Sequence, residues 1–125
     1  MGAPRHRVAP AKLRIEFGPE IAIGPGKAAL LEAIAETGSI AAAAKRFGMS
    51  YRRAWLLVDT MNRCFREPVV AAGTGGTGGG GAVVTAFGLD VVSRYRELES
   101  AARAALEAPV AAFAELLAPA PAKRP

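Results

Sequence analysis

The stretch Gly38–Cys64, GSIAAAAKRFGMSYRRAWLLVDTMNRC, decides the fold of this 125-residue chain. It holds two helix signals, each preceded by a serine N-cap: Ser39 before a segment of about two turns, and Ser50 before a longer one. Gly38 and Gly48 stand where helices stop. The pattern predicts a helix-turn-helix, in which the small residues of the first helix let the second one pack close at a steep angle.

Apolar residues recur at helical spacing in both segments. The first helix has one apolar face, formed by Ile40, Ala43, Ala44 and Phe47. The second helix, running to about Cys64, has another, formed by Ala54, Val58, Met61 and Phe65. Cys64 falls within this pattern and is interpreted as a small core residue rather than a redox centre. Because it is the only cysteine, the chain cannot form an internal disulfide and has too few cysteines for a zinc site.

The residues before Gly38 predict a helix and a strand. Lys27–Thr37 carries apolar residues at helical spacing and ends at the glycine. Lys12–Phe17 alternates polar and apolar side chains, as a half-buried strand does. Ile21–Ile23 is expected to continue this extended path until Gly24–Gly26 ends it.

The residues after Cys64 predict a β-hairpin and a long helix. Pro68–Ala71 and Ala82–Thr85 are the strands of the hairpin, joined by a glycine-rich connection. From about residue 86 to 117 an apolar stripe continues for longer than the short helices can cover, so a partner chain is the natural cover. Pro109 should kink this helix. The residues expected to make a dimer contact are Val91, Tyr95, Leu98, Ala102, Leu106 and Phe113.

These elements fit one domain, over residues 12–117, that is mostly α with a small β-hairpin: a winged helix-turn-helix plus a long C-terminal dimerisation helix. Residues 1–11 and 118–125 are rich in proline, alanine and basic side chains and are expected to be disordered tails. No run approaches the roughly 18 apolar residues of a membrane span, and no apolar leader follows the basic N-terminus. We therefore expect a cytoplasmic protein without membrane contact.

A formal charge of +5 favours a polyanionic partner. The cationic side chains gather at one corner, where Lys45 and Arg46 end one helix and Tyr51, Arg52 and Arg53 start the next. Arginine is the side chain best suited to bidentate contact with guanine or phosphate, and two arginines at a helix start oppose its macrodipole. This predicts contact with double-stranded DNA, against the alternative of a solvated charged face.

Two further features each leave two interpretations open. Trp55, next to Leu56, either anchors the helix to the body or contacts nucleic acid. The glycine-rich tip, with Thr74 and Thr77, is either a wing that contacts the sugar-phosphate backbone or a flexible linker.

The sequence argues against an enzyme. The glycine-rich tip leads into a strand and lacks the lysine and hydroxyl pair of a phosphate-binding loop. The segment Gly24–Lys27 also fails, because Ile21 stands where a glycine is required and Ala28 where a metal-binding hydroxyl is required. His6 is the only histidine and lies in a tail. We expect no catalysis, no cofactor, no metal and no small-molecule effector.

Together, GSIAAAAKRFGMSYRRAW, the following DTMN, TGGTGGGGAVVT and the FG pair that opens the last helix resemble the N-terminal DNA-binding domain of the molybdate-responsive ModE regulators, a winged helix similar to the LysR type. The resemblance covers roughly residues 12–100. It implies a homodimeric, bacterial DNA-binding regulator of transcription linked to molybdenum or oxyanion metabolism, which reads a pseudo-palindromic operator.

Two departures from the family matter. Its full-length members continue into oxyanion-binding domains, so direct sensing by this chain is not expected. Its wing carries basic residues where Ala72 and Thr77 stand here, which predicts weaker phosphate contact. The alternative is a co-regulator module that pairs with another regulator and binds DNA weakly alone. The expected DNA-binding residues are Ser39, Lys45, Arg46, Ser50, Tyr51, Arg52, Arg53, Trp55, Leu56, Thr74 and Thr77.

Overall fold

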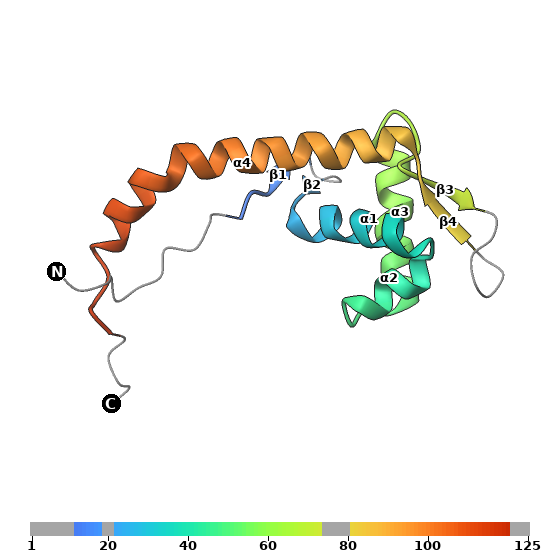
Figure 1. The fold of residues 1–125 in the computed structure, drawn as a ribbon, viewed down its shortest axis with the longest axis horizontal. Coiled ribbons are helices and arrows are strands. Elements are labelled where there is room, and N and C mark those ends of the chain that lie inside the picture. Colours follow the sequence, from blue (N-terminus) through green and yellow to red (C-terminus); the bar gives the residue numbers. More distant parts are fainter. Residues whose placement is uncertain (1–11, 19–21, 74–80, 121–125) are drawn as a thin grey trace.

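The structure is a computed structural model of the whole chain, and it describes residues 12–18, 22–73 and 81–120. In chain order its elements are β1 (Ile15–Glu16), β2 (Ala22–Ile23), α1 (Pro25–Thr37), α2 (Ile40–Arg46), α3 (Tyr51–Cys64), β3 (Val70–Gly73), β4 (Gly81–Val84) and α4 (Ala86–Ala114). The strands form two antiparallel pairs, β1 with β2 and β3 with β4. Figure 1 shows α1 to α3 gathered beside the wing formed by β3 and β4, with α4 running past them. The predicted fold class, mostly helical with a winged helix-turn-helix and a long last helix, is confirmed.

The helix boundaries follow from local chemistry. Ser39 and Ser50 cap α2 and α3, each accepting a hydrogen bond from the backbone N–H three residues later. Gly38 and Gly48 adopt left-handed φ values of 70° and 64°, which glycine reaches without steric cost. Pro25 starts α1, two residues before the predicted beginning, because proline suits the first helical position.

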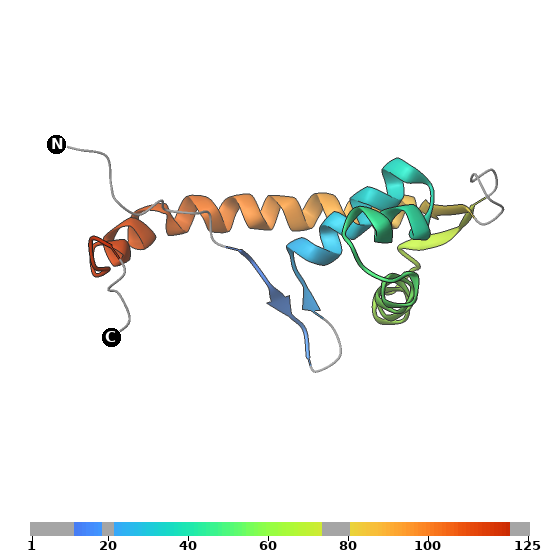
Figure 2. The same cartoon turned by 90° about the horizontal axis from the view of Figure 1, so that it is seen from below.

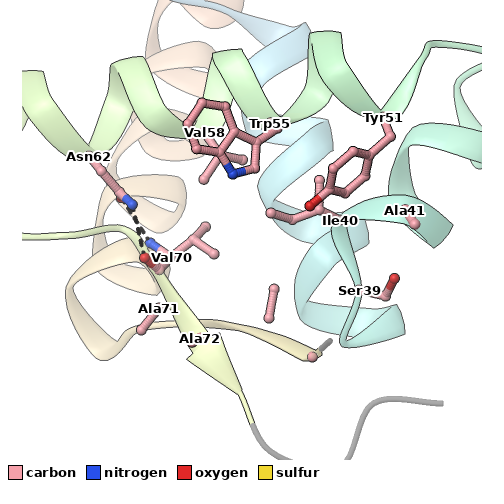
Figure 3. Close-up of a pocket in the computed structure, with 12 residues that line it drawn as sticks. Ser39, Ile40, Ala41, Tyr51, Trp55, Val58, Asn62, Val70, Ala71 and Ala72 are labelled. Carbon is pink, nitrogen blue, oxygen red and sulfur yellow. Dashed lines mark hydrogen bonds between the residues drawn. The ribbon is translucent and has the colours of Figure 1, made fainter. Parts of the chain in front are cut away.

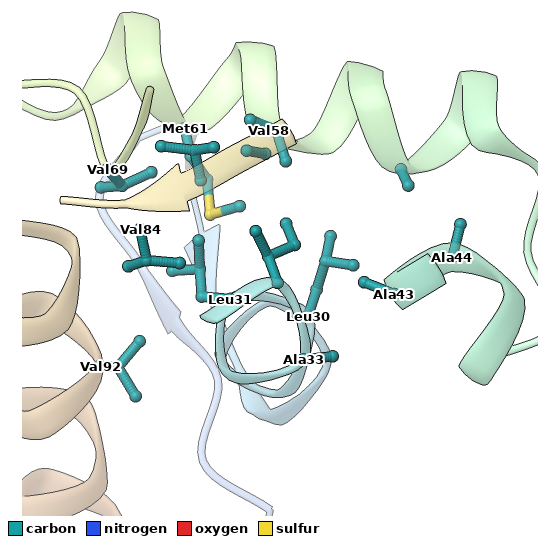
Figure 4. Packing of buried hydrophobic residues seen from close by; sticks show 14 residues of the cluster. Leu30, Leu31, Ala33, Ala43, Ala44, Val58, Met61, Val69, Val84 and Val92 are labelled. Atoms are coloured by element: carbon teal, nitrogen blue, oxygen red, sulfur yellow. The ribbon is translucent and has the colours of Figure 1, made fainter. Parts of the chain in front are cut away.

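The core lies where α1 crosses α2, α3 and the wing (Figure 4). Leu30, Leu31 and Ile34 of α1 are completely buried at its centre. Ala43 and Ala54 are also buried completely, and their small side chains let α2 and α3 approach closely. The remaining members include Val58, Met61, Val69, Val84 and Val92. One apolar core thus holds the helix-turn-helix, the wing and the start of α4 together.

Hydrogen bonds attach the wing to the body and close its base. The amide N–H of Ala82 in β4 donates to the carbonyl of Gly38 at 2.9 Å, and the N–H of Thr85 donates to the carbonyl of Val69 at 3.0 Å, which joins the two ends of the hairpin. Gly88 is buried against this junction, and a Cβ there would overlap the carbonyl oxygen of Val69. The absence of a side chain at Gly88 therefore sets how closely α4 approaches the wing.

The first part of the α4 stripe packs on the chain itself. Tyr95 is 2% exposed, in a second cluster with Ile23 and Ala28. Its hydroxyl donates to the carbonyl of Leu13 at 2.6 Å. Burial, followed by the charge of Glu99, raises the pKa of Tyr95 above its ordinary value. The expectation that Tyr95 contacts a partner chain is therefore wrong, because β1, β2 and α1 already cover it.

An ion-pair network joins α1 to α4 beside this tyrosine. Arg96 donates to Glu32 of α1 at 2.5 Å and to Glu99, one turn further along α4, at 3.0 Å. The hydrogen bond to Glu32 is the largest cause that raises the pKa of Arg96 above its ordinary value. Because Arg96 and Glu32 are 36% and 42% exposed, the ion pair between α1 and α4 orients the two helices more than it stabilises the fold.

The rest of α4 extends beyond the body (Figure 2). Its apolar side chains stay in contact with water, with Leu98 at 51%, Leu106 at 40% and Phe113 at 67% exposure. The helix continues through Pro109, and its last turns, which contain the proline, bend away from the long axis in Figure 1. The predicted kink is thus present as a bend within a continuous helix.

Three predictions about the strands are wrong in direction or in bounds. β2 runs antiparallel to β1, with Ile15 paired to Ile23, instead of continuing in the same direction. The first strand is limited to Ile15–Glu16, with Phe17 65% exposed. The wing strand predicted at Pro68–Ala71 begins two residues later.

Two residues placed in the apolar faces are also exposed. Cys64 lies at the exposed end of α3 and not in the core. Phe47, at the end of α2, is 44% exposed. Cys64 is the last residue of α3 and Phe47 is the C-cap of α2, so both stand at a helix end, and a helical period does not tell where the covering elements end.

In the described ranges, no helix is long and apolar enough to cross a membrane. The same residues hold no cluster of histidine, cysteine and carboxylate side chains that could bind a metal ion.

Candidate nucleic-acid interface

Helix α3 divides its side chains among three directions. Ala54, Val58 and Met61 point into the core. Tyr51 and Trp55, one turn apart, face the wing, and Arg52 and Arg53 project on the exposed side of the first turn. The helix start therefore presents an aromatic face and a cationic face next to each other.

Arg52 and Arg53 differ from the other arginines in having no carboxylate partner. Seven of the nine arginines in the described residues form ion pairs, namely Arg14–Glu16, Arg46–Glu36, Arg63–Asp59, Arg66–Glu67, Arg94–Asp90, Arg96–Glu32 and Arg103–Glu99. The first turn of α3 also holds no acidic residue. Two uncompensated cations thus lie at the positive end of the helix macrodipole, which disfavours them unless an anion binds nearby.

The two basic residues that end α2 are placed differently. Arg46 donates to Glu36 of α1 at 2.5 Å, with both side chains largely exposed. Lys45 is exposed, and no ion pair to it is found in the described part of the chain. Since exposed ion pairs contribute little, Arg46 can exchange its carboxylate for a phosphate at small cost.

A pocket of about 350 Å³ lies between α3, the start of α2 and the wing. Figure 3 shows the rings of Tyr51 and Trp55 extending from α3 over this space, with Ile40 behind them and the strand that carries Ala71 and Ala72 on the opposite side. None of the side chains that line the pocket is charged. Its walls are thus uncharged, formed by aromatic and aliphatic side chains together with Ser39 and Asn62, while the cations lie outside it.

Trp55 is 45% exposed, so the interpretation of this residue as a core anchor is wrong. Leu56 is exposed to the same extent, on the outer side of α3. Tyr51 is 55% exposed. The predicted residues of the α3 start thus share one accessible surface, as a contact with a partner requires.

The two serines of the predicted site already have structural roles. The hydroxyl of Ser39 accepts from the N–H of Ala42, and that of Ser50 accepts from the N–H of Arg53, each at 3.1 Å. A hydroxyl that accepts in this way keeps its own hydrogen for another acceptor. Ser50 also holds the backbone of Arg53 and so helps to orient the cationic turn.

Asn62 belongs to the DTMN stretch of the family resemblance, but no role in the site was predicted for it. Its Oδ1 accepts from the N–H groups of Val69 and Val70 at 2.8 and 3.2 Å, and its Nδ2 donates to the carbonyl of Val70 at 3.0 Å. These bonds fix the first strand of the wing to α3. No local pattern marks such a residue, because its partners lie seven and eight positions away across a loop. Thr74 and Thr77, predicted at the wing tip, lie outside the described residues.

Similar proteins come from one group. The chain is 46% identical over 78 residues to the molybdenum-pterin-binding protein MopB of Rhodobacter capsulatus, covering 62% of this chain and 29% of the relative. It is 39% identical over 97 residues to the molybdenum transport protein ModE of Azotobacter vinelandii, covering 78% and 36%. It is 37% identical over 83 residues to the DNA-binding transcriptional dual regulator ModE of Escherichia coli K12, covering 66% and 32%. No protein-family model matches.

The chain thus spans about a third of the length of these relatives. Two of these relatives have molybdenum in their names. The expectation of no small-molecule effector is therefore not supported. The cationic helix start, the wing and the long last helix occur together in a chain with these similarities. The chain is therefore a homologue of the ModE and Mop proteins, and it corresponds to the N-terminal part of the ModE-type regulators.

Proposed function

We propose that this chain binds double-stranded DNA as a sequence-specific regulator of transcription, with the start of α3 in the major groove. The observation that carries the proposal is the pair Arg52 and Arg53, which lack carboxylate partners while the other arginines of the described residues have them. A recognition helix contacts base edges with its N-terminal residues, and these are the positions that the two arginines occupy.

The similarity to ModE of Escherichia coli, which is named a DNA-binding transcriptional regulator, supports the same function. The names of the other relatives connect the proposal to molybdenum. In this proposal Lys45 and Arg46 contact phosphates beside the groove, with Ser39, Ser50, Tyr51, Trp55 and Leu56 completing the surface. Thr74 and Thr77 of the wing are assigned to the sugar-phosphate backbone. The regulated genes then concern molybdenum or oxyanion metabolism.

The proposal also includes a homodimer formed through α4. Leu98, Leu106 and Phe113 follow one another along the part of α4 that extends beyond the body, and all three are exposed. Val91 and Ala102 are partly buried on the same stripe. A second copy placed on this stripe would remove it from water, and the resulting two-fold symmetry calls for a pseudo-palindromic site.

The test measures DNA affinity after removal of the two unpaired cations. A duplex is first selected by the protein from a random pool, and its affinity is measured by fluorescence anisotropy over a series of salt concentrations. Each bidentate arginine contact contributes about 1–3 kcal/mol, so Arg52→Ala with Arg53→Ala should weaken binding by about 100-fold or more.

The matched control is Arg66→Ala with Arg94→Ala, which removes the same charge from residues that pair with Glu67 and Asp90. This control should lose only the small, non-specific electrostatic part of the affinity. Equal losses for the two double variants would contradict the assignment of Arg52 and Arg53. Failure of the unaltered protein to select any duplex would contradict DNA binding itself.

A further inference from the structure

Ser39, Tyr51 and Trp55 of the proposed DNA-binding surface also line the pocket between α3 and the wing, and the contact made by the pocket itself has not yet been assigned. Arginine recognition of guanine or phosphate does not require it, and its lining offers no cation to a phosphate. The one side-chain amide in its wall, that of Asn62, already donates to the carbonyl of Val70. The pocket therefore fits an uncharged group better than an ionic one, and its largest lining side chains, Tyr51 and Trp55, offer aromatic surface to that group.

Two aromatic side chains dominate this space. Tyr51 and Trp55 are 55% and 45% exposed, and both line the pocket together with Ile40, Ala41 and Val58. Large aromatic surface left in water at the centre of a binding face is stabilised when a partner covers it. Figure 3 shows the two rings on the same wall, facing the small alanines of β3. The side chains on the wing side of the pocket are small, so they leave the space in front of the rings unfilled.

The position of the pocket on the binding surface indicates which molecule occupies it. This step rests on the proposed DNA binding. The cationic face of α3, with Arg52 and Arg53, lies immediately beside the aromatic face. When the arginines reach bases in the major groove and the wing lies against the backbone, the DNA strand between these two contacts passes over the pocket. Bases in a duplex remain stacked, so that strand offers its apolar edges rather than its ring faces.

We propose that the pocket receives the hydrocarbon surface of this DNA strand, a thymine C5-methyl group or deoxyribose carbons, packed against Tyr51 and Trp55. Apolar contact with the thymine methyl is one of the ways in which a protein distinguishes base pairs in the major groove. The arginines then contribute charge and guanine contacts, while the pocket contributes a separate, uncharged part of the recognition.

Trp55 is the only tryptophan of the chain, so its fluorescence reports directly on the pocket. The full chain is titrated with a duplex that it has selected from a random pool, and both the tryptophan emission and the anisotropy of the labelled duplex are followed. We expect the emission to change in intensity or wavelength with the same midpoint as binding. The same titration with an unselected duplex at low salt shows whether the change requires the correct site.

Variants separate the pocket from general apolar exposure. Trp55→Ala should weaken binding by about tenfold, as the loss of a packed aromatic group does, and Trp55→Phe should restore most of the affinity. Ala72→Leu leaves both aromatic residues in place but fills the pocket from the wing, and should also weaken binding. Phe17→Ala is the control, since Phe17 is a 65% exposed aromatic residue on another element. Circular dichroism checks that each variant is folded.

Base analogues distinguish the two sources of hydrocarbon. Each thymine of the selected duplex is replaced in turn by deoxyuridine, which lacks the C5-methyl group. A position at which the replacement weakens binding to the unaltered protein but not to Trp55→Ala assigns the thymine methyl. If no position behaves in this way while Trp55→Ala and Ala72→Leu still weaken binding, the contact is with deoxyribose.

The inference is overturned if the duplex binds, the emission of Trp55 stays constant and Trp55→Ala binds as tightly as Phe17→Ala. In that outcome the proposed function still stands, because the arginine variants test it independently. If no duplex is selected at all, both the proposed function and the inference fail.

Discussion

At the residue scale, side chains of one type have different roles according to their partners. Arg96 holds α1 against α4 through Glu32, and Arg46 pairs with Glu36 in the same way between α2 and α1. Arg52 and Arg53 make no such connection in the described chain. Their removal should therefore affect binding far more than folding, which is why they serve as the first test of function.

Tyr95 provides a test of the packing between α4 and the N-terminal strands. Its phenol is buried and its pKa lies above the ordinary value of 10.0, so the folded chain holds this proton more tightly than the unfolded chain does. The resulting stability is fully present below about pH 10 and is lost as the pH rises through the folded-state pKa. We expect the unaltered protein to lose its stability advantage over Tyr95→Phe in this range.

The measurement is urea unfolding of both proteins from pH 8 to 11, expressed as the difference in free energy of unfolding. At the lower pH the unaltered protein should be more stable by about 1 kcal/mol, from the hydrogen bond to the carbonyl of Leu13. A difference that stays constant over the whole range would contradict the burial of this phenol.

Gly88 tests the contact between α4 and the wing. A Cβ at this position would overlap the carbonyl oxygen of Val69 and crowd a methyl group of Val84, so Gly88→Ala should lower the free energy of unfolding by about 1–3 kcal/mol. Gly26→Ala is the matched control, because a Cβ there meets nothing within 4 Å and alanine favours the helix. Chemical denaturation should show opposite signs for the two variants, and equal signs would argue against the close approach.

At the scale of elements, α3 combines functions that are usually considered separately. One face packs in the core, one carries the unpaired arginines, and one forms the aromatic wall of the pocket. Near the end of the same helix, Asn62 fixes the wing strand. The recognition surface and the wing are therefore positioned by a single rigid element.

Asn62→Ala should separate the wing from α3 without removing a core residue. It leaves two backbone N–H groups and one carbonyl without their side-chain partner, which costs about 1–3 kcal/mol of stability. Hydrogen exchange at Val69 and Val70 should become faster than at core positions of α1. Asn62→Asp keeps the acceptor and loses the donor, so its exchange rates at the two valines should lie between those of the unaltered protein and those of Asn62→Ala. Unchanged protection at both valines in Asn62→Ala would contradict this anchoring role.

At the scale of the whole molecule, α4 extends well beyond the folded body and carries an uncovered apolar stripe (Figures 1 and 2). The body covers the stripe at Val92 and Tyr95, and leaves it exposed from Leu98 onward. The reason is length, since α1 has 13 residues and α4 has 29. A second copy of the chain is the proposed cover of the remainder.

Leu98→Glu tests this proposal. The charge lies on the exposed stripe, where burial against a second copy would leave it unpaired, so the protein should sediment as a monomer. Leu89→Glu is the control, since Leu89 is equally exposed at 52% and lies nine residues earlier, on about the opposite side of the helix at 100° per residue. Analytical ultracentrifugation should find the control dimeric. An unaltered protein that is monomeric at every concentration would contradict the dimer and favour a different partner for the stripe.

The sequence predicted the helix-turn-helix closely. The serine caps, the glycine stops and the apolar faces of α2 and α3 are local features that act within one or two turns. The same local rules misplaced Cys64 and Phe47, because a helical period does not tell where the neighbouring element ends. They also left the role of Trp55 open, since whether a large apolar side chain is covered depends on residues distant in the chain.

The sequence by itself determined the order and caps of the helices, the cationic start of α3 and the length of the apolar stripe on α4, because each depends on residues within a few positions of one another. Only the tertiary structure decided that Tyr95 belongs to the chain's own core, where its hydroxyl reaches Leu13, 82 positions away. It also decided which arginines lack a carboxylate and that a pocket opens between α3 and the wing. Those properties arise when distant segments pack together, and no local pattern encodes them.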